Sequence, residues 1–248
     1  EVGLKNLSER GSSIQTSERK ERLLYRAMDR SRRATDPQNY NDDGTVKKGR
    51  KTWKYSNHYK KLKAKHSELC RINAINRQLA INEDANHLRS LGDVFITEPK
   101  NASKLMKRTK DTTVNSKGKF HKKKRFGKSI KNRCPSGFQT TVERKFKVSG
   151  GIYIEVPNNY RASQYDHTAD DYIKKKLSDR MYKLTDGTLV QRDWYSSFLL
   201  YCYDYRTKDI DKNKCISEFD KCYNKEKALI EWIKANKIKI LNSGIKIA

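Results

Sequence analysis

The sequence predicts an α/β or α+β domain into which a long, basic helical hairpin is inserted. Two segments with alternating apolar side chains, residues 94–97 and 152–156, are typical of short strands. Helical patterns precede, separate and follow these strands, and residues 2–7 add a further short apolar segment. The resulting order of strand, helix, helix, strand, helix, strand and helix is that of a sheet with helices packed against it.

The composition indicates a polyanionic partner. The 248 residues include 56 Lys and Arg but only 29 Asp and Glu, which gives a net charge of +27. Nucleic acid is the commonest partner of so basic a chain. No run of 18 apolar residues occurs, so we expect no membrane span and no membrane partner. The five cysteines form no CxxC pair, which fits a reducing compartment such as the cytoplasm and excludes a zinc ribbon built from cysteines.

Residues 1–98 contain the hairpin. One helix ends in the sequence DRSRRAT, and a second, over residues 54–91, has apolar side chains at spacings of three, four and seven. Their connected ends carry clustered cations, of which we select Arg30, Arg32, Arg33, Lys60 and Lys61. These cations either form a solvated helix end or contact nucleic-acid phosphates, and the residues alone leave both interpretations open.

Two acids stand where a sheet domain places functional groups. Glu98 follows the strand at 94–97, and Pro99 then prevents the strand from continuing. It is either an ordinary turn acid or a functional group at the carboxyl end of a strand. Asp193 lies near the start of the apolar helix within residues 189–202. It either complements the helix dipole or binds a metal together with a second acid.

Residues 99–132 form a basic loop, with 13 Lys or Arg and one acid. Its centre, GKFHKKKRFGKS, interleaves two phenylalanines with cations. The segment is either a solvated, flexible loop or a loop that orders on nucleic acid by binding phosphates and stacking bases, and the two descriptions are compatible. The selected cations of this loop are Lys122, Lys123, Lys124, Arg125 and Lys128.

The remaining chain divides into two parts. Residues 133–203 contain a helix over 133–149, the strand at 152–156 and the apolar helix, with a polar, loop-rich insertion at 158–188. The acids and His167 of this insertion match no closed zinc site. Residues 204–248 form a C-terminal tail with a mixed-charge helix around 216–240 and no recognisable chemistry.

Seven stretches together resemble the insertion-sequence OrfB, or TnpB, family of RNA-guided DNA endonucleases. The resemblance covers about residues 23–203, follows the order of the family and is closest to its transposase branch from Gram-positive bacteria. It implies an RNase H-like (RuvC) nuclease fold, a transposon-encoded cytoplasmic protein of bacteria, and guide RNA and target DNA as partners. The stretches are DRSRRAT, NYNDDGTVKKG, SNHYKKLKAKHSEL, GDVFITEPKN, GKFHKKKRFGKSI, RASQYDHTADDYIKKKLSDR and VQRDWYSSFLLYC.

The resemblance assigns catalytic and metal-binding roles to Glu98, in FITEPKN, and to Asp193, in QRDWYSSF. It implies Mg²⁺ or Mn²⁺ as the cofactor of phosphodiester hydrolysis. We therefore expect the two carboxylates to lie close enough to share a metal site. Family members usually carry a zinc ribbon between these positions, but residues 158–188 contain no Cys, so no zinc is expected there.

The family also requires a first catalytic Asp on its opening strand. Either Glu1 replaces that Asp, or the Asp lies upstream of the sequence given. Only 27 residues separate Glu1 from Asp29, so we expect residues 2–7 to be the second strand and the RNase H-like domain to be incomplete at its N-terminus. An endonuclease fragment, a nuclease-inactive RNA- or DNA-binding remnant, a guide-dependent DNA binder and an ordinary basic RNA-binding structural protein then remain alternatives. The sequence does not indicate the oligomeric state.

Overall fold

The computed structural model describes residues 12–99, 106, 112–116, 118, 127–176, 178–240 and 243–247. The chain forms two compact units. The hairpin unit comprises Leu7–Asn86 and Ala102–Thr141, and the mixed unit comprises Glu1–Asn6, His87–Asn101 and Val142–Ala248. These units cut across the division expected from the sequence, because both the hairpin and the basic loop lie outside the mixed unit. The expected strand at 2–7 lies outside the described residues.

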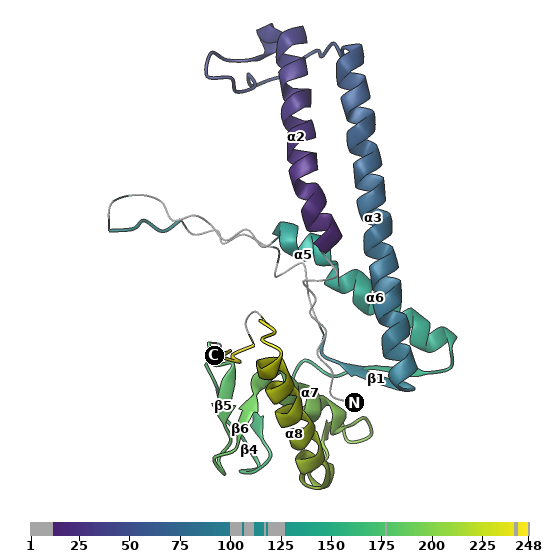
Figure 1. Cartoon of the computed structure of the whole chain (residues 1–248), viewed down its shortest axis with the longest axis vertical. Coiled ribbons are helices and arrows are strands. Elements are labelled where there is room, and N and C mark those ends of the chain that lie inside the picture. Colours follow the sequence, from purple (N-terminus) through teal and green to yellow (C-terminus); the bar gives the residue numbers. More distant parts are fainter. Residues whose placement is uncertain are drawn as a thin grey trace. The chain divides into compact units, whose positions relative to one another are not determined.

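In the hairpin unit, helices α2 (Ser12–Thr35) and α3 (Asn57–Leu91) lie side by side (Figure 1). Ser17 of α2 donates a hydrogen bond to Asn73 of α3, whereas Ser31 of α2 bonds to Ser56 just before α3. Residues later in α2 therefore meet residues earlier in α3, so the helices run antiparallel. A short 3-10 helix, η1 (Pro37–Asn39), begins the connection between them. Helix α5 (Gly127–Arg133) and most of α6 (Pro135–Val148) complete this unit.

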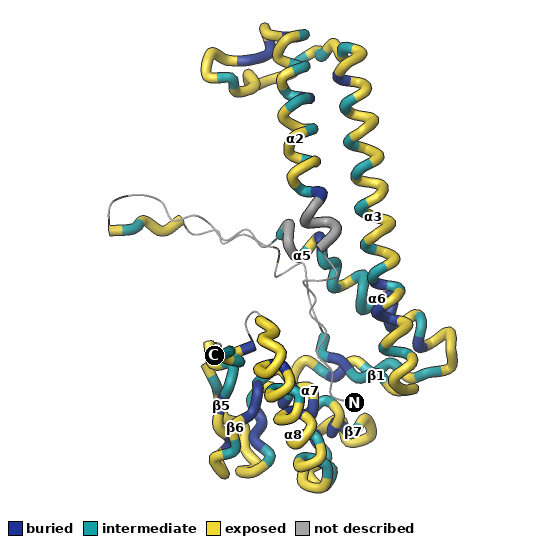
Figure 2. The backbone as a smooth tube through the Cα atoms, in the orientation of Figure 1, coloured by how far each residue is buried: buried dark blue, intermediate teal, exposed yellow. Residues whose placement is uncertain are grey.

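The long helices bury less apolar surface than their periodicity predicts. Exposed residues predominate along both helices (Figure 2). Ile72, Ile75 and Leu79, which we expected on the buried face of α3, are between 41% and 60% exposed. Tyr59, Ile81 and Ala85 are the apolar residues of α3 that are buried. The hairpin is therefore held by polar contacts as well as by apolar ones.

In the mixed unit, strands β1 (Val94–Thr97) and β2 (Ile152–Glu155) pair in parallel. They match the predicted strands to within one residue. Arg89 joins the turns that precede them, since its guanidinium donates to Asp93 Oδ1 and to Ser149 Oγ, both at 2.6 Å. Gly151 is required at this junction, because a Cβ there would lie 2.9 Å from the carbonyl oxygen of Asp93.

Three antiparallel pairs follow in the mixed unit. They are β3 (Tyr165–Asp166) with β4 (Asp171–Tyr172), β5 (Met181–Lys183) with β6 (Leu189–Gln191), and β7 (Tyr203–Asp204) with β8 (Asp209–Ile210). Helix α7 (Arg192–Tyr201) follows β6 directly, and α8 (Lys212–Ala235) follows β8. Within the described part of the chain every sheet consists of two strands. No described helix combines the length and apolarity that crossing a membrane requires.

The core of the mixed unit forms around α7. Tyr195 and Leu199 of α7 pack with Val190 of β6, Cys202 and Cys215, all at most 2% exposed. The polar insertion and the C-terminal tail both contribute to this core. Its remaining buried members are Val156, Tyr160, Ala162, Tyr165, Tyr182, Leu184, Phe198, Tyr203 and Ile210. Residues 158–188 are therefore built into the fold by their aromatic side chains, although their composition is polar.

Candidate functional site

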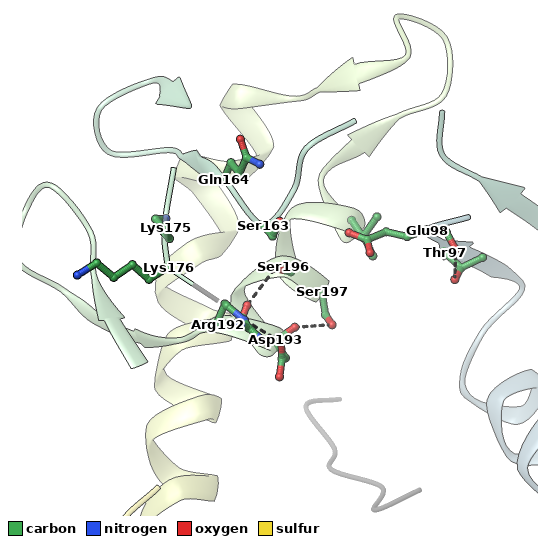
Figure 3. Close-up of a pocket in the computed structure, with 11 residues that line it drawn as sticks. Thr97, Glu98, Ser163, Gln164, Lys175, Lys176, Arg192, Asp193, Ser196 and Ser197 are labelled. Atoms are coloured by element: carbon green, nitrogen blue, oxygen red, sulfur yellow. Dashed lines mark hydrogen bonds and ion pairs between the residues drawn. The ribbon is translucent and has the colours of Figure 1, made fainter. Parts of the chain in front are cut away.

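A pocket of about 450 Å³ in the mixed unit is lined by both acids that the sequence analysis selected (Figure 3). Three parts of the chain form it, namely the carboxyl end of β1, residues of the 158–188 insertion and the first turns of α7. Cationic and hydroxyl side chains share the pocket with Glu98 and Asp193. They are Ser163, Lys175, Lys176, Arg192, Ser196 and Ser197. This lining suits a charged, hydrophilic ligand.

Glu98 lines the pocket because β1 ends immediately before it. The last paired residues of the β1–β2 ladder are Thr97 and Glu155. One further ladder hydrogen bond follows, donated by the Val156 N–H to the Thr97 carbonyl at 2.9 Å. Val156 is buried in the core, so the end of the strand is fixed there. Glu98 thus stands at the carboxyl end of a parallel strand, where α/β sheets commonly carry functional groups.

Asp193 is positioned by a tightly bonded junction between β6 and α7. Gln191 is the N-cap of α7, and its side-chain oxygen accepts a hydrogen bond from the Trp194 N–H at 2.9 Å. The Gln191 N–H donates to Glu226 Oε1 at 2.7 Å, and its side-chain amide donates to the Ser243 carbonyl at 3.2 Å. These bonds hold the first turn of α7, and therefore Asp193, in a fixed place.

Two guanidinium groups lie beside the Asp193 carboxylate. Arg192 Nη2 is 3.1 Å from Asp193 Oδ1, and Arg180 Nη1 is 3.8 Å from Oδ2. The Asp193 side chain is 60% exposed. Exposed ion pairs of this kind contribute little stability, so the carboxylate can exchange these partners for a ligand at small cost.

Lys175 is the least ordinary cation of the pocket. Its ammonium group lies 3.6 Å from the centre of the Tyr182 ring and 5.6 Å from that of Tyr195. It is buried and has no hydrogen-bond partner among the residues that the structure describes. Burial lowers the pKa of Lys175 to about 8, against the opposing influence of Asp166. The sequence analysis did not select Lys175, although the run of three lysines at 174–176 was a visible signal.

The other predicted binding residues lie elsewhere. Arg32 and Arg33 both pair with Asp29, at 3.3 and 2.8 Å, and their guanidinium groups stack on Trp53 and Tyr40. Part of their charge is therefore engaged within the hairpin unit, as the interpretation as a helix end requires. Arg30, Lys60 and Lys61 of the same unit are exposed. Lys122, Lys123, Lys124 and Arg125 lie outside the described residues, and of Lys128 only the backbone is described, within α5.

His167 is a packed residue of the core periphery. Its Nδ1 lies 2.7 Å from the Tyr195 hydroxyl, and its ring stacks at 4.2 Å between centres on Phe219. Burial lowers its pKa, which favours the neutral ring. Its neighbour Asp166 is also buried, which raises a carboxyl pKa, but hydrogen bonds from Thr168 and Thr185 lower that pKa overall. Both residues thus organise the β3–β4 and β5–β6 hairpins.

The pocket offers the oxygen donors that Mg²⁺ and Mn²⁺ prefer, in the form of two carboxylates with serine hydroxyls beside them. Mg²⁺ usually takes one or two protein carboxylates and completes its coordination with water and substrate phosphate. The residues present therefore fit such an ion. No protein-family model matches this chain, and no curated protein matches it either.

Proposed function

We propose that this chain is part of a transposon-encoded, RNA-guided DNA endonuclease, with its mixed unit serving as an RNase H-like nuclease core. One observation carries the proposal. Glu98 and Asp193 are far apart in the sequence, yet they line one pocket together with several cations. A carboxylate pair beside cations is the arrangement that hydrolysis of a phosphodiester, an anionic substrate, requires.

Glu98 and Asp193 would hold the divalent cation in this reaction. When bound, Mg²⁺ or Mn²⁺ supplies activation of the attacking water and stabilisation of the leaving oxygen. Lys175, Lys176 and Arg192 orient the scissile phosphate by charge–charge contacts at the pocket wall. Because α7 is fixed by Gln191 and by its buried face, Asp193 meets the substrate without reorganisation of the backbone.

The exposed cations of the hairpin unit supply the nucleic-acid contacts in this proposal. Arg30, Lys60 and Lys61 bind the backbones of guide RNA and target DNA, while base pairing between the two strands reads the sequence. Such contacts make binding strongly dependent on salt concentration. The basic loop at 99–132 adds to the same electrostatic surface.

The proposal is tested by cleavage of labelled single- and double-stranded DNA by the chain co-expressed with RNA from its own genetic element. We expect cleavage with Mg²⁺ and none with EDTA, and a loss of at least about 10²-fold in Asp193→Asn and in Glu98→Gln. Glu231→Gln, which changes an exposed acid of α8, is the matched control and retains activity. Equal cleavage by Asp193→Asn would remove Asp193 from the mechanism.

A second function, guide-dependent nucleic-acid binding without cleavage, is favoured by the two arginines beside Asp193. With Arg180 and Arg192 as permanent partners, Asp193 would be a structural acid of the α7 terminus. This alternative predicts salt-sensitive binding of RNA or DNA and no cleavage with any divalent cation. It also predicts that Asp193→Asn binds nucleic acid at least as tightly as the unchanged chain, because a negative charge is lost.

A further inference from the structure

A second group of chemically reactive side chains lies within the hairpin unit. His66 and Cys70 are one helical turn apart on α3, so they share a face of that helix. Glu21 of α2 meets them from the facing helix. One ligand atom from each residue lies within 4.8 Å of the other two. The sequence analysis did not select this group, because Glu21 is distant in sequence from the other two residues.

The separations match those between the ligands of a tetrahedral zinc ion. Zn–N and Zn–O bonds of about 2.0–2.1 Å and a Zn–S bond of about 2.3 Å place N and O ligands about 3.4 Å apart and N and S ligands about 3.6 Å apart. His66 Nε2 is 3.7 Å from Glu21 Oε1 and 3.6 Å from Cys70 Sγ. Little rearrangement would be needed for the three atoms to bind one ion.

The surroundings favour binding of a metal from solution. The side chains of His66 and Glu21 are 15% and 24% exposed, and Cys70 is exposed. The ring of Tyr25 packs on the His66 imidazole, with 4.5 Å between ring centres, which restricts the orientation of the imidazole. A partly shielded imidazole and carboxylate next to an accessible thiol leave a fourth coordination position open to water.

The donor types select the metal. Nitrogen and sulfur ligands suit Zn²⁺, whereas Mg²⁺ prefers the oxygen donors present at Glu98 and Asp193. The expectation that zinc is absent concerned residues 158–188, and this cluster lies outside that segment. We propose that Glu21, His66 and Cys70 form a Zn²⁺ site that links α2 to α3.

The link has a structural consequence for the hairpin. Its two helices expose much of their apolar periodicity, including Ile75 and Leu79 of α3 and Leu23 of α2. Metal bonds from both helices add to the stability of the bound form, because the unfolded chain does not hold the three ligands together. Zinc binding therefore stiffens the surface that carries Arg30, Lys60 and Lys61.

Cobalt provides the direct test, since a thiolate bound to Co²⁺ gives a charge-transfer absorption band and tetrahedral Co²⁺ gives intense visible bands. The full chain, stripped of metal with EDTA and exchanged into buffer, is titrated with Co²⁺ and then with Zn²⁺. We expect one equivalent of Co²⁺ to produce both bands and Zn²⁺ to remove them. Cys70→Ser abolishes the charge-transfer band, and His66→Ala and Glu21→Gln each weaken Zn²⁺ binding at least about tenfold.

Cys222→Ser is the matched control, because it removes a half-buried thiol from α8 of the mixed unit. This variant retains the bands and the affinity for Zn²⁺. Cys70 is exposed, so Cys70→Ser is expected to fold normally, which circular dichroism verifies. Absence of the charge-transfer band in the unchanged chain, its survival in Cys70→Ser, or unchanged Zn²⁺ affinity in His66→Ala would each overturn the site.

Discussion

Lys175 illustrates how a single side chain can be prepared for a ligand that carries negative charge. Its ammonium group is buried against Tyr182, and burial lowers its pKa to about 8. A phosphate entering the pocket would supply the counter-charge that the ammonium group does not receive through a hydrogen bond from any described residue.

This environment predicts a pH dependence of nucleic-acid binding. Because the pKa of Lys175 is about 8, the residue is a cation at pH 7 and becomes neutral as the pH rises above that value. Affinity for a short single-stranded DNA, measured by fluorescence anisotropy at constant salt, should fall several-fold between about pH 7 and 9. Lys175→Met should lose this dependence, whereas Lys176→Met, from the same pocket, should keep it. An identical pH profile in Lys175→Met would show that Lys175 does not contact the ligand.

Glu226 gives a second prediction, for stability. Burial raises its pKa to about 7, although the Gln191 N–H partly opposes the shift by donating to the carboxylate. A carboxyl group whose pKa is higher in the folded than in the unfolded chain stabilises the fold fully below about pH 4.5, and this contribution is lost as the pH rises through about 7. Glu226→Gln keeps an acceptor for Gln191 and removes the charge. We expect it to flatten the loss of stability between about pH 5 and 8 in urea unfolding, while Glu231→Gln leaves the loss unchanged.

At the scale of elements, α7 is the helix on which the candidate site depends. Tyr160 donates a buried hydrogen bond to the Leu199 carbonyl of α7 at 2.6 Å, and its ring packs edge-on against Tyr203. Tyr182 is equally buried, but its hydroxyl has no hydrogen-bond partner among the described residues. The two tyrosines therefore form a natural pair for measuring what the hydrogen bond to α7 contributes.

Tyr160→Phe should lower the free energy of unfolding by about 1–2 kcal/mol, since it leaves the Leu199 carbonyl without that donor. Tyr182→Phe should be neutral or slightly stabilising, because it removes a buried hydroxyl that makes no hydrogen bond to a described residue. Urea unfolding of both variants, followed by tyrosine and tryptophan fluorescence, gives the comparison. Equal losses in the two variants would contradict the assignment of the hydrogen bond.

At the scale of the whole molecule, net charge dominates the expected binding behaviour. The segment 99–132 carries 13 of the 56 cations. Replacing Lys122, Lys123, Lys124 and Arg125 by Ala should weaken DNA binding and reduce the slope of log affinity against log salt by up to about 3. A control variant should reduce the slope less, because its four exposed cations lie along α8. These cations are Lys221, Lys225, Lys227 and Lys234. Equal slopes for the loop variant and the unchanged chain would place the loop away from the nucleic acid.

Local patterns in the sequence determined the charge, the two long helices, the strands β1 and β2, and the choice of Glu98 and Asp193 as candidate acids. Each of these depends on a few neighbouring residues or on composition, so no knowledge of packing was needed. Periodicity overstated the burial of Ile75 and Leu79, because a pattern shows which face is apolar but not whether another element covers it.

Tertiary structure decided everything that joins distant segments. It brought Glu98 and Asp193 to one pocket, added Lys175 to them, and placed Glu21 beside His66 and Cys70. It also built residues 158–188 into the core through Tyr160, Tyr165 and Tyr182. Such contacts follow from how the helices and strands pack, and packing depends on side chains from many segments at once. A single sequence read locally carries no record of those meetings, so the composition of both candidate sites emerged only from the folded chain.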